Sequence, residues 1–179
     1  YETFLGYLRH DLEIYVTGMG ANLDPARHRL LHRVMACLPD LWDEVWEPRL
    51  ADHKILPLIH GDLNPCNVLY PLQAGGQVVL VDWEAYHRGL PASDLTMLLG
   101  LHLCPEKDAV LPYLHAYHAC LVSAGVRGYP FTDLLQDYQI ALLYALFFPI
   151  KLYSQSGIQD QTMMDNAVLA VESFHEPDE

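Results

Sequence analysis

The sequence L-I-H-G-D-L-N-P-C-N-V-L-Y at Leu58–Tyr70 is followed, after a short connection, by V-V-L-V-D-W-E at Val78–Glu84. The apolar residues that end the first stretch and begin the second predict two short antiparallel strands. A pair of glycines lies between them, where a tight connection needs a positive φ angle. Such a hairpin would bring Asp82 back beside Asn67, so the region is predicted to be built around one polar loop.

Three polar side chains in these stretches suit phosphoryl transfer. The carboxylate of Asp62 can accept the proton of a substrate hydroxyl. The amide oxygen of Asn67 and the carboxylate of Asp82 are oxygen ligands of the kind that Mg²⁺ prefers. Each residue alone indicates only a turn or a strand end, because Asp and Asn side chains bond to nearby backbone. The three in this order, with a hydrophobic strand between them, favour a site for phosphoryl transfer.

The pattern His-x-Asp-Leu-x-x-x-Asn at His60–Asn67, followed by a strand and an Asp-aromatic pair, resembles the catalytic and metal loops of protein-kinase-like phosphotransferases. Three details resemble the aminoglycoside phosphotransferase and choline kinase-like family more than protein kinases. Gly61 stands where protein kinases usually have Arg, and Asp82–Glu84 reads D-W-E rather than D-F-G. The segment Gly89–Leu95 is similar to the G-x-P-x-x-D-L segment of this family.

The resemblance implies a role for each residue of the motif. Asp62 would be the catalytic base, and Asn67 and Asp82 would be metal ligands. Asp94 would support the catalytic loop through hydrogen bonds to its backbone, and His60 would be a structural member of the loop. The implied cofactor is Mg²⁺, with ATP as the co-substrate and a small-molecule hydroxyl compound as the acceptor.

Two loop positions depart from the commonest form of the family. Asn64 stands where His is frequent, and Cys66 stands where Gly is frequent. Neither side chain carries chemistry, so neither changes the assignment. The thiol of Cys66 beside a metal site would be open to oxidation.

The resemblance implies an α+β, mostly helical fold in which residues 1–179 form a single domain. This domain is expected to be the C-terminal lobe of a protein-kinase-like fold, with a small β-hairpin carrying the catalytic and metal loops. The N-terminal lobe of such enzymes supplies a phosphate-covering loop and a strand lysine. Lys54 lies too close to the motif for that role, and Lys107 and Lys151 follow it. We therefore expect the nucleotide-binding lobe to be absent from this chain, as in a fragment of a longer kinase.

The charge of the chain limits its partners. A net charge of −13 argues against nucleic acid or an anionic membrane as a partner. It is compatible with a cationic small-molecule substrate, although acidity also serves solubility alone. The longest apolar run, Ile140–Ile150, falls short of the roughly 20 residues that a membrane-spanning helix needs.

The cysteines indicate a reducing compartment. They show neither C-x-x-C pairs nor regular spacing, which is typical of free thiols in the cytoplasm. Charged residues interrupt the first apolar positions, so no signal peptide is predicted at the start of the sequence. We therefore expect a cytoplasmic protein. The cysteines are Cys37, Cys66, Cys104 and Cys120.

Helical periodicity and end signals account for the rest of the chain. A helix is predicted over Phe4–Val16, with a break at Gly18-Met19-Gly20. Asp24 is expected to cap a second helix through Cys37, and Pro39 to begin another. The remaining helices are predicted over 93–103, over 106–124 with a stop at Gly125, from a cap at Thr132 to a kink or end at Pro149, and over 160–174.

Other polar and aromatic clusters are interpreted structurally. The pairs His28/His32 and His115/His118 have a spacing that can bind zinc, but neither has a third ligand nearby, so surface or partly buried histidines are favoured. Glu84 could assist a metal through water or contact the next loop. Acidic residues that could face a cationic substrate are interpreted as solvated helix faces: Asp133, Asp137 and Glu172. Aromatic residues that could line a substrate pocket are interpreted as helix core: Tyr138, Tyr144, Phe147, Phe148 and Tyr153.

The leading hypothesis is an ATP-dependent small-molecule kinase. The alternative is a non-catalytic kinase-like binding module or an inactive fragment that lacks the N-terminal lobe. A third hypothesis, a phosphohydrolase with two metals at His60, Asp62 and Asp82, is disfavoured because such sites need more ligands. The sequence does not identify the acceptor.

Overall fold

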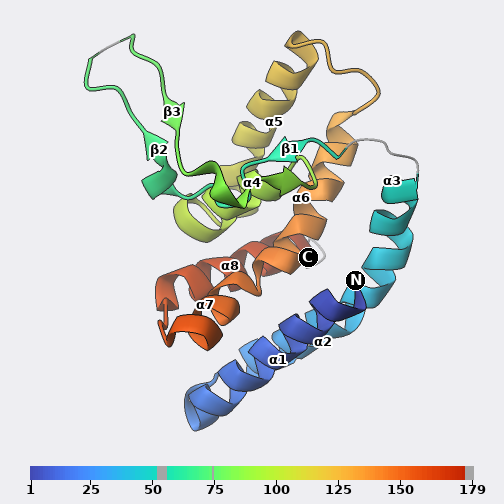
Figure 1. Cartoon of the computed structure of the whole chain (residues 1–179), viewed down its shortest axis with the longest axis vertical. Coiled ribbons are helices and arrows are strands. Elements are labelled where there is room, and N and C mark those ends of the chain that lie inside the picture. Colours follow the sequence, from blue (N-terminus) through green and yellow to red (C-terminus); the bar gives the residue numbers. More distant parts are fainter. Residues whose placement is uncertain (52–55, 74, 176–179) are drawn as a thin grey trace.

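The computed structural model describes residues 1–51, 56–73 and 75–175. It is mostly helical, with two antiparallel sheets of two strands each (Figure 1), which confirms the predicted α+β, mostly helical class. Lys54 lies outside the described residues. Within the described part, no helix is both long enough and apolar enough to cross a lipid bilayer.

The chain begins with an antiparallel pair of helices, α1 (Glu2–Met19) and α2 (Pro25–Leu41), which Figure 1 shows side by side. Gly20 ends α1 with a φ angle of 50°, and a short 3₁₀ turn follows. The Asp24 carboxylate caps α2 by accepting hydrogen bonds from the backbone N–H groups of Ala26 and Arg27, both at 2.9 Å. The predicted break and cap are therefore confirmed.

The prediction that Pro39 begins a new helix is wrong. Pro39 lies inside α2, and the helical path continues through a π-helical segment, η2 (Trp42–Trp46), into α3 (Glu47–Ala51). A proline inside a helix removes one backbone hydrogen bond and crowds the preceding turn. Here Leu31, Val34 and Leu38 are buried on the same face of α2, and this packing keeps the helix intact around the proline.

The second half of the chain is a group of helices around η5, a π-helical segment at Thr96–Leu103 that continues α4 (Ser93–Leu95). Two details of the helix ends differ from the prediction. Pro130, not Thr132, is the N-cap of α6, and α6 ends before Pro149, which lies in the first turn of α7. The other helices are α5 (Lys107–Ser123), α6 (Phe131–Ala145), α7 (Phe148–Ser156) and α8 (Gln161–His175).

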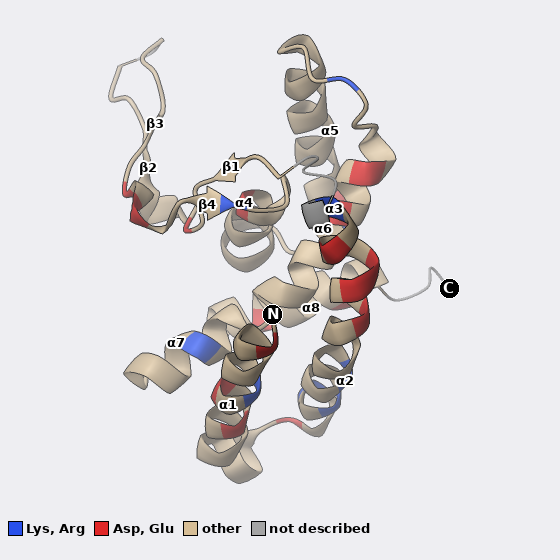
Figure 2. Cartoon of the chain, turned by 45° about the vertical axis from the view of Figure 1, so that its right-hand side comes forward, with Lys and Arg blue, Asp and Glu red and all other residues tan. Residues whose placement is uncertain are grey.

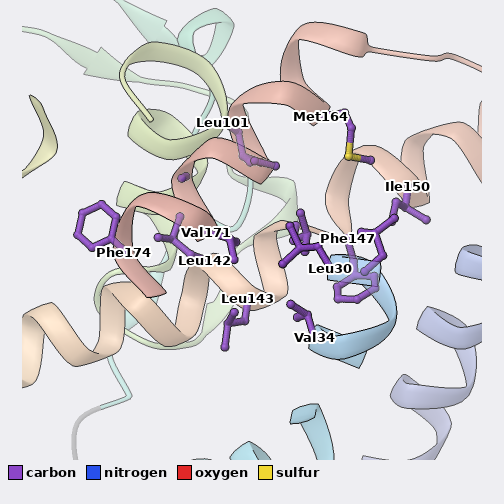
Figure 3. Packing of buried hydrophobic residues seen from close by; sticks show 14 of the residues in the cluster. Leu30, Val34, Leu101, Leu142, Leu143, Phe147, Ile150, Met164, Val171 and Phe174 are labelled. Atoms are coloured by element: carbon purple, nitrogen blue, oxygen red, sulfur yellow. The ribbon is translucent and has the colours of Figure 1, made fainter. Parts of the chain in front are cut away.

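One apolar core joins the two halves of the chain. Helix α1 packs on α7, and η5 packs against both α6 and α8. Figure 3 shows side chains of α2, α6, α7 and α8 meeting in this core, among them Val34, Leu143 and Phe147. Because most of these helices are buried on one face only, the packing between them, rather than propensity, holds their positions.

The buried face of α6 includes a charge, so the interpretation of Asp137 as part of a solvated face is wrong. Asp137 is 0% exposed. Its Oδ1 lies 2.6 Å from Nη2 of Arg49 on α3, and its Oδ2 accepts a 2.7 Å hydrogen bond from the Tyr129 hydroxyl. Burial first, and then this hydrogen bond, raises the pKa of Tyr129 above its usual value. The ion pair fixes α3 against α6.

The two small sheets position the polar loop. The predicted hairpin is present: β2 (Val68–Leu69) pairs with β3 (Val79–Leu80), with Val68 opposite Leu80. A second pair, β1 (Leu58–Ile59) with β4 (His87–Arg88), was not predicted. Because β1 enters the loop and β4 follows Asp82, this second pair closes the segment into a compact unit above α4 (Figure 1).

Candidate active site

The loop between β1 and β2 is tied together around Asp62. The Asn67 side-chain amide donates to the Asp62 backbone oxygen at 2.9 Å and to its Oδ2 at 3.2 Å. The Asn64 amide donates to Oδ1 of Asp62 at 3.2 Å, and the Asn64 oxygen accepts from the Cys66 backbone N–H at 2.9 Å. This last bond caps the 3₁₀ turn Pro65–Asn67. Both carboxylate oxygens of Asp62 are thus oriented by neighbours on the same loop.

Asp94 holds the loop from behind. Its Oδ2 accepts a 2.7 Å hydrogen bond from the His60 backbone N–H, and its Oδ1 accepts a 2.9 Å bond from the Gly61 N–H. Asp94 lies in the first turn of α4, so the carboxylate links the loop to the helical core. Hydrogen bonds to an ionised acceptor are stronger than those between neutral groups, which makes this a firm attachment.

His60 connects the loop to the strand that leads to Asp82. It is 1% exposed, its Nε2 lies 2.9 Å from the Val81 carbonyl oxygen, and its ring packs 4.6 Å from that of Trp83. Its Nδ1 accepts from the Asp62 backbone N–H at 3.3 Å, so Nε2 must carry the proton that it donates to Val81. One buried ring therefore couples the positions of Asp62 and Asp82.

Asp82 has a special backbone conformation. It is the only non-glycine residue of the described chain with a positive φ angle, at φ 63° and ψ 59°. The residue before it, Val81, donates its N–H to the Asn67 carbonyl oxygen at 3.0 Å, so Asp82 follows directly on this cross-strand contact. Residues other than glycine rarely adopt this backbone conformation. Where they do, the strained position is often a functional one.

The oxygen atoms around this loop suit a Mg²⁺ ion whose other ligands are phosphate and water. Asn67 uses its amide hydrogens on Asp62, which leaves its side-chain oxygen available as a ligand. The Asp82 carboxylate is exposed and makes no hydrogen bond or ion pair with the described residues, and the same holds for Glu84. Among those residues, no three His, Cys, Asp or Glu side chains are grouped to hold a metal ion. One amide oxygen and one carboxylate are ligands of the kind that Mg²⁺ takes when phosphate and water complete its coordination.

No motif or spacing in the sequence marks His102. It lies half-buried on η5. Burial lowers the pKa of His102, while the negative charges of Asp160 and then Asp62 oppose that shift. The environment of His102 depends on how η5 packs against α6 and α8, which no motif records.

The remaining histidines of interest have packing contacts. The rings of His28 and His32 lie 4.4 Å apart, and the ring of His115 stacks on Phe131 at 3.8 Å. His118 Nε2 lies 2.9 Å from the Tyr129 carbonyl oxygen. His28 and His118 are half-buried and His32 and His115 are exposed, which agrees with the predicted surface or partly buried histidines.

The reactivity of the four cysteines should follow their burial. Cys66 and Cys120 are exposed, whereas burial raises the pKa of Cys37 and Cys104. We expect Cys66 and Cys120 to react first with a thiol reagent such as DTNB near pH 7.5, because the thiolate is the reactive form. Mass spectrometry of the labelled protein measures the order in which the four thiols react. Equal rates at all four would contradict the burial of Cys37 and Cys104.

The comparisons with known proteins agree with this geometry. The family model described as "Phosphotransferase enzyme family" matches residues 3–135, a span that includes the loop, the hairpin and Asp94. No curated protein and no solved structure gave a significant match. The matched span exceeds half of the chain and confirms the family predicted from the loop motif. The chain therefore belongs to the phosphotransferase enzyme family.

Proposed function

We propose that this chain carries the catalytic residues of an ATP-dependent kinase that transfers the γ-phosphoryl group to the hydroxyl of a small molecule. Family membership supports the general reaction. The proposal rests on the Asp62 carboxylate, whose two oxygens are held by the Asn64 and Asn67 amides on a loop that Asp94 supports. A carboxylate oriented before the substrate arrives meets the first requirement of a general base.

In this mechanism Asp62 accepts the proton of the acceptor hydroxyl. The hydroxyl oxygen forms a bond to the γ-phosphorus as the bond from that phosphorus to the bridging oxygen of ADP breaks. Asn67 and Asp82 would hold Mg²⁺, which neutralises charge on the phosphate oxygens when bound. His60 keeps the two halves of the site in register, since it contacts Asp62 and the carbonyl before Asp82.

Exposed apolar side chains on the hairpin favour the presence of a second lobe that packs against them. Leu69, Tyr70 and Val79 are 51%, 69% and 50% exposed, and the nearby Trp83 ring is 43% exposed. Leu69 and Val79 lie opposite each other in the strand pair, and exposed apolar side chains that gather in this way often mark a contact with another segment or protein. We propose that the chain is the C-terminal lobe of a protein-kinase-like fold, and that a nucleotide-binding lobe encoded with it closes over this face.

Substitutions of Asp82 distinguish a metal-binding role of its carboxylate from a structural role of its backbone conformation. Replacing Asp82 by Gly should raise the free energy of unfolding by about 1 kcal/mol, because glycine adopts a positive φ angle without strain. The same change should weaken Mg²⁺-dependent ATP binding by about tenfold or more, because a carboxylate ligand is lost. Calorimetric titration of the full-length gene product with ATP, with and without Mg²⁺, measures the second effect.

Asp82→Asn is the matched variant for this experiment. Asn tolerates the left-handed conformation as Asp does, so its stability should stay near that of the original chain while Mg²⁺-dependent binding falls. Magnesium-independent affinity in the unsubstituted protein, or unchanged affinity in both variants, would refute the metal role of Asp82.

A further inference from the structure

An apolar cavity lies behind the catalytic loop. Its volume is about 620 Å³, within the range of roughly 300–1,000 Å³ that is typical of small-molecule sites. Segments from both halves of the chain form its walls: α1, η2, the β1–β4 pair, α4, α6 and α7. Its aromatic lining consists of Phe4, Trp42, Trp46, Tyr144, Phe147 and Phe148.

This cavity is separate from the proposed phosphoryl-transfer site. Its walls include Gly61 and Asp94, which lie on the rear of the loop, but not Asp62, Asn67 or Asp82. A molecule bound there would contact the support of the loop and not its catalytic carboxylate. A ligand of this cavity would therefore be a different molecule from the substrates of the proposed phosphoryl transfer.

Among the described residues, the wall offers no unpaired carboxylate that would oppose a bound anion. The rings of the half-buried residues Trp46 and Tyr144 meet edge to face, with their centroids 6.0 Å apart. The only carboxylate on the wall, that of Asp94, already accepts from the His60 and Gly61 backbone.

Two cationic side chains border the same cavity. Arg88 lies on β4 and Lys151 on α7, and Figure 2 shows a basic segment on each of these elements. Both side chains are exposed, and neither forms an ion pair with the described residues. They stand out in a chain of net charge −13, because that charge as a whole repels anions. The local charge of the cavity thus favours a ligand that carries a negative group.

We propose that this cavity binds an amphiphilic organic anion, a molecule with an apolar body and one terminal carboxylate. The aromatic walls would take the apolar body by removing its surface from water. The carboxylate would lie toward Arg88 and Lys151. This inference does not rest on the proposed kinase activity, since binding is measured without ATP or an acceptor.

Three probes of one chain length test the proposal: decanoate, decanol and decyltrimethylammonium, each below its micelle concentration. Trp42 and Trp46 line the cavity and Trp83 does not, so a Trp83→Phe background leaves tryptophan fluorescence as a local reporter. Decanoate should bind saturably, decanol more weakly, and the cation at least about tenfold more weakly than decanoate. Equal affinity for the anion and the cation, or no saturable change with decanoate, would overturn the proposal.

Two variants test whether decanoate binds in this cavity. Ala145 lies on its wall, so Ala145→Phe should fill the space and abolish decanoate binding. The double substitution Arg88→Glu/Lys151→Glu should weaken decanoate by about tenfold and reduce its preference over the cation. Circular dichroism and thermal unfolding verify that each variant is folded.

The control is Arg29→Glu/Arg33→Glu, which makes the same change in net charge at two exposed positions of α2. Decanoate affinity should change little in this variant. An equal loss in both double variants would show that only the overall charge of the chain matters, and it would overturn the assignment of Arg88 and Lys151.

Discussion

Replacing Asp62 by Asn is expected to lower the rate of phosphoryl transfer by about 10²–10⁴-fold, because the loop then lacks a base for the acceptor proton. The asparagine side chain has nearly the same shape, but its single oxygen can accept from only one of the Asn64 and Asn67 amides. The bonds of Asp94 to the loop backbone remain, so the loop should stay in place. The affinity for ATP should remain close to that of the unsubstituted protein, since Asp62 is not a proposed metal ligand. Steady-state transfer from radiolabelled ATP to a panel of sugars and amino alcohols measures the rate.

Two comparisons make this result specific. Asp43→Asn changes an exposed carboxylate on η2 and should leave the rate unchanged. Asn64→Ala removes one of the two amides that orient Asp62, so its loss of rate should be smaller than that of Asp62→Asn. A rate in Asp62→Asn equal to that of the unsubstituted protein would remove Asp62 from the role of base.

The largest effect on stability is expected at the buried ion pair between α3 and α6. Arg49→Met should lower the free energy of unfolding by about 3–5 kcal/mol, because it leaves the Asp137 carboxylate buried without its cation. Such a loss is a large part of the roughly 5–15 kcal/mol that holds a typical domain together. Urea unfolding followed by circular dichroism measures it, provided that the slope of the transition stays the same.

The control is the pair of Arg27 with Asp165, in which the carboxylate, unlike that of Asp137, is exposed to solvent. Asp165 is 53% exposed at its side chain, so Arg27→Met should cost no more than about 1 kcal/mol. Replacing the whole buried group by apolar residues, with Arg49→Met, Asp137→Leu and Tyr129→Phe together, should recover most of the stability. Equal losses of unfolding free energy in Arg49→Met and Arg27→Met would show that the pair with Asp137 stabilises the fold no more than the pair with Asp165.

Tyr129 should make the free energy of unfolding depend on pH in the alkaline range. Its pKa is raised in the folded protein, so its contribution is complete below the unfolded value of about 10 and is lost as the pH rises above it. The unsubstituted chain should therefore lose stability above about pH 10 more steeply than Tyr129→Phe does. Parallel loss in both proteins would exclude Tyr129 as the cause.

The loop and hairpin could be predicted because their determinants are local. The two strands, the glycine turn and the three residues Asp62, Asn67 and Asp82 all lie within one short stretch of sequence. Their spacing was therefore enough to predict the loop and the hairpin. The left-handed conformation of Asp82 could not be predicted in this way. It depends on cross-strand contacts and on the buried ring of His60, neither of which the sequence records.

The errors in the fold have tertiary causes. Pro39 stays inside a helix because the buried face of α2 outweighs one lost hydrogen bond. Asp137 occupies a position that looks solvated until its partner is known, and Arg49 lies far away in the chain. The β1–β4 pair has strands of two residues each, which are too short to carry an alternating pattern.

The close contact at Gly61 has a consequence for regulation. A Cβ atom there would lie 2.3 Å from the Ala85 carbonyl oxygen, and Gly61 already has a φ angle of 82°, which disfavours any other residue. Protein kinases usually carry an arginine at this position, and arginine–phosphate contacts are a common way to order their activation loops. The turn before β4 occupies the space that such an arginine needs, so this loop has no place for a phosphate sensor at position 61. The folded contacts themselves, rather than a modification read at this residue, hold the loop in its assembled state.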